Sequence, residues 1–124
     1  MGKFKTLRDA LESDLNVISV PVMQDWLVRA EPPCILIAAP ISNQYVTEGK
    51  EFGAVVLNLD VVVLVNAHPQ ADARNALEEL LEDVLRNSVD WALIGVDAPG
   101  TASLPDSTVE FLGTVVHLGK SVQL

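Results

Sequence analysis

The stretch from Phe52 to Asn66 is the feature that most constrains the fold of this 124-residue chain. From Val55 onward every odd position carries an apolar side chain, whereas the even positions mix apolar side chains with Asn58 and Asp60. Successive side chains of a β-strand point to opposite faces of a sheet, so the pattern predicts a long strand with one fully apolar face. Another layer must cover that face. On the other face Asn58 and Asp60 need water or polar partners, because burying them unpaired costs a few kcal/mol.

Two segments are predicted to be helices that supply this layer. The clearer one runs from Pro69 to Arg86, with Pro69 at the first helical position and Asn87 as a left-handed stop. Its apolar residues recur at helical spacing without a break: Ala73, Ala76, Leu77, Leu80, Leu81, Val84 and Leu85. The opposite side of this helix carries acidic residues that are expected to face solvent: Glu78, Glu79, Glu82 and Asp83. A shorter helix is predicted from Thr6 to Leu15, with Thr6 as its cap.

The remaining segments alternate between strand and loop patterns. Strands are predicted at 17–22 (short or at a sheet edge), 34–39 (buried on both faces), 89–96 and 109–118, with a bulge at Gly113. Polar loops are predicted at 41–51 and 101–107. The order α-β-β-β-α-β-β predicts a single α+β domain over residues 1–124. In it two helices pack on one face of a mainly antiparallel four- to five-stranded sheet.

Charge and hydropathy disfavour two classes of protein. The chain has 17 acidic against 8 basic residues, a formal charge of −9, whereas nucleic-acid binders neutralise phosphates with a Lys/Arg patch. Its longest apolar runs, 34–39 and 61–65, are far shorter than the roughly 20 residues that span a bilayer as a helix. The single cysteine, Cys34, has no internal disulfide partner. We therefore expect a soluble protein made in the cytoplasm, with no membrane partner and no specific nucleic-acid binding.

No motif of a common catalytic or cofactor site occurs in the sequence. No serine lies in G-x-S-x-G, and no glycines follow the G-x-G-x-x-G spacing. Cys34 with two distant histidines, His68 and His117, makes a poor set of zinc ligands. We expect no catalytic residues, no metal and no cofactor, although a Ser-His-Asp arrangement assembled in space from His68 or His117 stays open.

Several segments together resemble a known family. They are Leu7-Arg8-Asp9-Ala10-Leu11, Glu31-Pro32-Pro33-Cys34-Ile35, the strand 55–65, the helix 73–85 and Gly95-Val96-Asp97-Ala98-Pro99-Gly100. Over nearly its whole length the chain resembles the tail terminator (tail completion) proteins of long-tailed bacteriophages, especially those of actinobacterial phages. These segments reflect element order and turn chemistry and include no catalytic signature.

The resemblance implies structural work in the virion, at the tail or neck. Members of that family close the growing tail tube as a six-membered ring, stop its polymerisation and present a surface to the head–tail connector. The partners implied are therefore other copies of the chain in a hexameric ring, the tail tube protein and the connector or neck protein. DNA passes through such a ring without specific binding. The alternatives are another phage neck or head-completion ring protein and a small ligand-binding or enzymatic α+β domain, which would need a deep pocket with convergent polar groups.

The sequence offers candidate contact residues for such a ring. Aromatic side chains in polar surroundings make Tyr45 and Trp26 candidate interface residues. The mixed face of the longest strand adds four more: Asn58, Asp60, Val62 and Leu64. Asp60 and Glu110 are candidate lumen-facing acidic residues, which would keep DNA from adhering to the channel.

Overall fold

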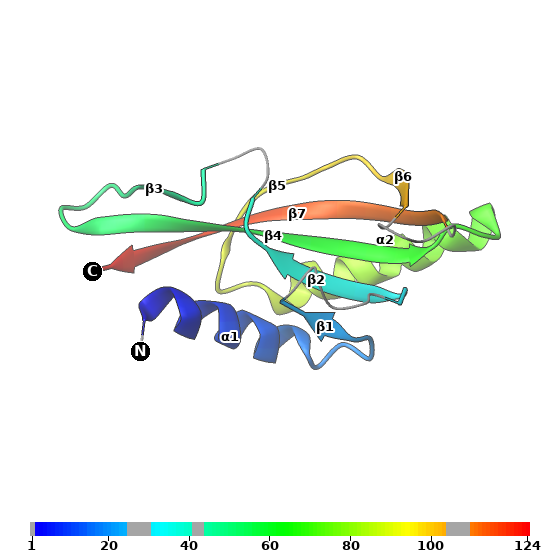
Figure 1. Cartoon of the computed structure of the whole chain (residues 1–124), viewed down its shortest axis with the longest axis horizontal. Helices are drawn as coiled ribbons and strands as arrows, with labels where there is room; N and C mark the ends of the chain where they lie inside the picture. The colour runs from blue at the N-terminus through cyan, green and yellow to red at the C-terminus, as the bar shows by residue number, and fades with distance from the viewer. Residues whose placement is uncertain (1, 25–30, 41–43, 104–109) are drawn as a thin grey trace.

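A computed structural model describes residues 2–24, 31–40, 44–103 and 110–124 of the chain (Figure 1). It has an α+β architecture with two helices and one mixed sheet. The elements in chain order are α1 (Lys3–Leu15), β1 (Val22–Met23), β2 (Cys34–Ala38), β3 (Val46–Glu48), β4 (Ala54–Asn66), α2 (Gln70–Asn87), β5 (Ala92–Val96), β6 (Gly100–Ser103) and β7 (Glu110–Gln123).

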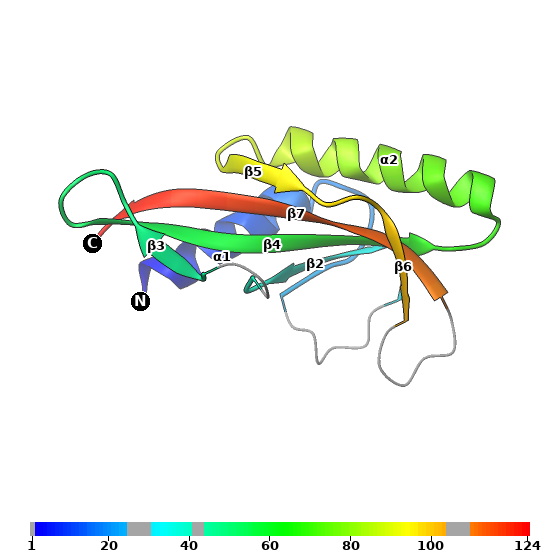
Figure 2. The ribbon, with the colours of Figure 1, turned by 90° about the horizontal axis from the view of Figure 1, so that it is seen from above.

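Two long strands, β4 and β7, form the axis of the sheet. They are 13 and 14 residues long and pair antiparallel from Ala54–Gln123 to Asn66–Phe111 without a break in register. The path across the sheet is β1-β2-β4-β7-β5, with β3 also on β4 and β6 also on β7. Strands β2 and β3 therefore follow one another along the outer side of β4 (Figure 2), and the pairing places β5 and β6 along β7. The β1–β2 pair is parallel and the other pairs are antiparallel.

Both helices pack on the same face of this sheet, as predicted (Figure 1). The odd residues of β4 from Leu57 to Val65 are buried there together with Val116 and Leu118 of β7. The helices contribute Leu11, Leu15, Ala73, Leu77, Leu80 and Val84 to the same core. Removing this much apolar surface from water is the main stabilising term of the fold.

A second, smaller cluster lies on the opposite face of the sheet. It consists of Cys34, Leu36, Leu64 and Phe111, with Met23 and Val62 packed against it. Strand β2 is therefore buried at all five positions, which confirms the prediction of a strand buried on both faces.

The helix ends differ in detail from the predictions. Helix α1 begins at Lys3, and the Thr6 hydroxyl donates to the Gly2 carbonyl at 3.1 Å, so Thr6 lies inside the first turn and is not the cap. Pro69 is the N-cap of α2 rather than its first helical residue, and Asn87 ends the helix without a left-handed conformation. The Asn87 amide donates instead to the Asp83 carbonyl at 2.8 Å, which satisfies one of the terminal carbonyls.

Over the described residues the sheet has seven strands rather than four or five. Segment 41–51, predicted as a loop, contains β3, and 101–107 begins with the end of β6. Neither short strand shows an alternating apolar pattern in the sequence. Each is held by backbone pairing to a long neighbouring strand rather than by burial of an apolar face. The predicted bulge at Gly113 is also wrong, since the register shift lies in β5 between Leu93 and Gly95.

Gly113 has a packing role instead. A Cβ atom built on it would lie 2.6 Å from Leu64 Cδ2 and 3.0 Å from the Val63 carbonyl oxygen. Glycine is favoured there because any larger residue would press on the buried Leu64 side chain and crowd the Val63 carbonyl oxygen.

Candidate functional site

A polar cluster lies on the sheet face opposite to the helices. Asp60 of β4 and His117 of β7 are direct partners in the ladder, and the Asp60 Oδ1 atom lies 2.6 Å from Nδ1 of His117. The other ring nitrogen, Nε2, lies 2.9 Å from Oδ1 of Asp97. Asp97 follows β5 and is anchored to β7 by its own backbone, which donates to the Val115 carbonyl and accepts from the Thr114 hydroxyl. The imidazole therefore links the two central strands to the β5–β6 connection.

Electrostatics in this cluster favour a charged imidazole. Burial lowers the pKa of His117, but the hydrogen bonds with Asp97 and Asp60 raise it more, and the net pKa lies above its ordinary value. A Ser-His-Asp arrangement needs one ring nitrogen directed at a hydroxyl. Both nitrogens of His117 face carboxylates, so the cluster lacks that geometry. His68 is largely exposed, with Nε2 at 3.9 Å from Glu110 Oε2.

Asn58 also obtains its polar partners within the chain. Its Nδ2 atom donates to the Gln44 carbonyl at 2.9 Å and to the Thr47 hydroxyl at 3.3 Å. Its backbone N–H donates to the Tyr45 carbonyl at 2.8 Å. The prediction that Asn58 and Asp60 need polar partners is confirmed, and in the single chain those partners are intramolecular.

The candidate interface residues differ in how exposed they are in the single chain. Leu64 fills the second apolar cluster, Val62 is half-buried beside it, and Asn58 and Asp60 are buried, so these four do not form an open surface in the single chain. The even residues of β4 lose their exposure because neighbouring segments cover that face as well. Tyr45 is exposed and precedes β3, whereas Trp26 lies outside the described residues.

The two predicted acidic residues are not brought together. The Asp60 side chain is only 10% exposed and is paired with His117, so it offers no free carboxylate to a channel. Glu110 is exposed at the other end of β7, near His68. Of the two, only Glu110 presents its charge to solvent.

Strand β5 carries an apolar surface that the sequence analysis missed. Leu93 and Ile94 are 54% and 58% exposed, and Val96 is also exposed. Among the described strands β5 pairs with β7 alone, so its outer edge is open. The apolar run in 89–96 indicated a strand, but nothing in the sequence indicates which strand ends a sheet. Exposed apolar side chains along an open edge are typical of a protein-binding surface.

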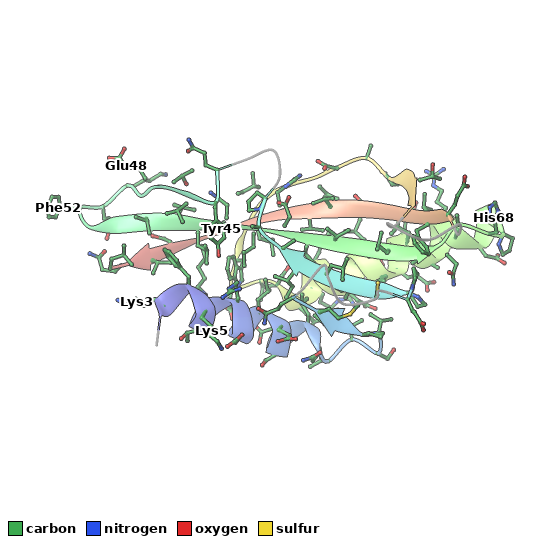
Figure 3. All side chains as sticks on the ribbon, viewed as in Figure 1. Lys3, Lys5, Tyr45, Glu48, Phe52 and His68 are labelled. Carbon is green, nitrogen blue, oxygen red and sulfur yellow. The ribbon has the colours of Figure 1, made fainter. Side chains whose placement is uncertain are left out.

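The tip of the β3–β4 hairpin carries a second exposed apolar group. Phe52 is fully exposed there and points away from the molecule (Figure 3). The turn beneath it is held by hydrogen bonds from Gly49 N–H to the Ala54 carbonyl and from Ala54 N–H to the Glu51 carbonyl. Gly53, at φ +79°, supplies the left-handed residue that the turn requires.

A shallow pocket lies at the far end of β4, where the chain enters α2. Its volume is about 180 Å³, and its lining is mostly apolar: Pro33, Val65, Asn66, His68, Asp72, Ala73 and Ala76. His68 marks this end of the molecule in Figure 3, opposite to Phe52. The pocket is separate from the His117 cluster and contains none of its residues.

Neither a metal-binding group nor a membrane helix occurs in the described part of the chain. No three His, Cys, Asp or Glu side chains there are grouped to hold an ion. Within the same residues no helix is both long and apolar enough to cross a membrane.

A scan against protein-family models finds no match, and a search of curated proteins finds no significant match.

Proposed function

We propose that this chain is a structural virion protein that closes the end of a phage tail tube as a hexameric ring. In this role it ends polymerisation of the tube and provides the surface to which the head is joined. The proposal starts from the resemblance of the chain to tail terminator proteins in the order of its elements and in its turn residues.

The open β5 edge is the observation that carries the proposal. Leu93, Ile94 and Val96 are exposed on β5, a strand whose outer side is not paired by any other described strand. Water-exposed apolar side chains in a row are costly for a free protein and gain free energy when a partner covers them. We assign this edge to the contact with the tail tube subunits.

The charge of the chain fits a ring through which DNA passes. Six copies at −9 each carry a strongly negative field, which opposes adhesion of a polyanion. Glu110 supports this because its carboxylate is exposed, whereas the carboxylate of Asp60 is buried and paired with His117. Replacing Glu110 with Lys is expected to slow DNA passage, and unchanged passage would remove Glu110 from the channel lining.

Tube assembly in vitro tests the proposed function. The tail tube protein is polymerised with and without the chain, and tube lengths and ends are examined by electron microscopy. We expect annular particles of six subunits at tube ends and tubes that stop growing. Unchanged tube lengths with no bound chain would reject the role, and binding to the head's portal side instead would favour a neck or head-completion protein.

A pair of variants tests the part played by β5. The double substitution Leu93→Lys and Ile94→Lys is expected to abolish capping while the fold is kept, because both side chains are exposed. Val89→Lys is the matched control, since Val89 is 78% exposed but lies in the turn before β5. Equal capping by all three proteins would remove β5 from the tube contact.

A further inference from the structure

We propose that copies of this chain associate head to tail, with the Phe52 ring of one copy seated in the pocket beside α2 of the next. The inference goes beyond the proposed function, because it concerns the contact between copies and holds for any assembly that they form. Phe52 and the pocket lie at opposite ends of the long axis of the molecule (Figure 3).

The hairpin tip is a preformed projection. Phe52 is fully exposed although its backbone is well anchored, since its carbonyl accepts from the Gln123 amide at 3.2 Å. The next residue, Gly53, accepts from the backbone N–H of Leu124 at 3.1 Å. A rigid aromatic side chain loses little conformational entropy when a partner buries it, which is why aromatic residues dominate protein contacts.

The pocket is a shallow, open depression whose volume and apolar walls could accept part of an aromatic side chain. Its volume of about 180 Å³ compares with the roughly 150 Å³ of an apolar cavity that takes up benzene. Pro33, Val65, Ala73 and Ala76 supply apolar walls. The small side chains of α2 at this point leave the opening that the larger leucines fill elsewhere along the helix.

The chain cannot fill its own pocket. Phe52 precedes the first residue of β4 and the pocket lies at its last residues, so the 13 residues of the strand separate them by about 43 Å. A pocket that receives Phe52 must therefore belong to a second molecule. A second copy of the chain carries both an exposed Phe52, the knob, and a pocket beside α2, the hole.

Charges at the two ends complement one another. Lys50 lies two residues from Phe52 on the hairpin tip, and Asp72 lines the pocket. The positive charge of Lys50 at the tip therefore matches the negative charge of Asp72 at the pocket.

A knob at one end and a hole at the other define a heterologous contact. Such contacts generate a ring when the rotation between neighbours closes and an open filament when it does not. Each copy in a closed ring, and each inner copy of a filament, contacts one neighbour through its tip and the other through its pocket.

Complementation between two variants tests the contact. Phe52→Ala removes the knob, and Ala76→Trp fills the hole from an exposed helix position; both changes spare the buried core. Size-exclusion chromatography with light scattering, run over a range of concentrations, is expected to show larger assemblies for the unmodified chain and monomers for each variant alone. An equimolar mixture should form one-to-one dimers that grow no further, because only one intact knob and one intact hole can meet.

A control and the contrary results complete the test. Val17 follows α1 and its side chain is 73% exposed. Val17→Ala therefore removes apolar surface from another exposed site and should leave assembly unchanged. The contact is overturned if the unmodified chain is monomeric at the highest concentration reached, if either variant assembles normally, or if the mixture stays monomeric. Assembly through this contact without tube capping would reject the proposed function alone. Tube capping by rings of Phe52→Ala would reject this inference alone.

Discussion

The Nδ1 atom of His117 lies 2.6 Å from Oδ1 of Asp60, its direct partner across the β4–β7 ladder. Asp97 holds the other ring nitrogen at 2.9 Å. Burial lowers the pKa of His117, but the hydrogen bonds with Asp97 and Asp60 outweigh it and the net pKa is raised. The imidazole of His117 therefore binds its proton more tightly in the folded chain than in the unfolded one.

Stability is expected to fall with rising pH because of His117. A group with a raised folded pKa contributes fully below its unfolded value of about 6.5, and its contribution is lost as the pH rises through the folded pKa. Urea unfolding between about pH 6 and pH 9 measures this slope. His117→Gln should flatten it, whereas His68→Gln, at an exposed position, should retain it. An unchanged slope in His117→Gln would contradict the assignment.

Asp97 is expected to contribute directly to the raised pKa of His117. Asp97→Asn removes a carboxylate at 2.9 Å and should lower the pKa of His117, as followed by NMR titration of the ring protons. Asp90→Asn is the matched control, because Asp90 lies in the exposed turn before β5. A pKa that responds equally to both variants would show a general charge effect rather than this contact.

Gly113→Ala is expected to destabilise the fold by about 1 to 3 kcal/mol, the usual range for overpacking a core. The added methyl would lie 2.6 Å from Leu64 Cδ2 and 3.0 Å from the Val63 carbonyl oxygen, so strand or side chain must shift. Gly100→Ala, in β6 of the same sheet, has no atom within 4 Å of the new methyl and should change stability by less than about 0.5 kcal/mol. Chemical denaturation of both variants checks the difference, and equal stabilities would contradict the close approach of β7 to β4.

The sequence predicts the two elements in which apolar residues recur at an unbroken strand or helix period. The alternation over 52–66 and the leucine stripe of 69–86 each predict an element within two residues of its observed bounds. Apolar burial sets both patterns, so local sequence records them. Strands β3 and β6 left no such record, because a short polar strand is specified by the neighbour with which it pairs.

The candidate site was less accessible to prediction for the same reason. Asp60 and His117 are 57 residues apart, and only the β4–β7 register makes them partners. The exposure of Leu93 and Ile94 depends on β5 being at an edge, which strand patterns do not encode. Phe52 was predicted as the first residue of the long strand, whereas β4 begins at Ala54 and Phe52 lies in the turn before it.

Cys34 is expected to resist thiol reagents as long as the second apolar cluster is closed. It is fully buried in β2, and burial raises the pKa of its thiol to about 11. Because the thiolate is the reactive form, an aromatic disulfide reagent near pH 8 should modify the native chain slowly and the urea-unfolded chain at the rate of an ordinary thiol. Leu36→Ala, which opens the cluster beside Cys34, should accelerate the native reaction, whereas Val17→Ala on the exposed surface should not. Rapid modification of the unmodified native chain would mean that β2 opens readily, and that this sheet face is closed only when a partner covers it.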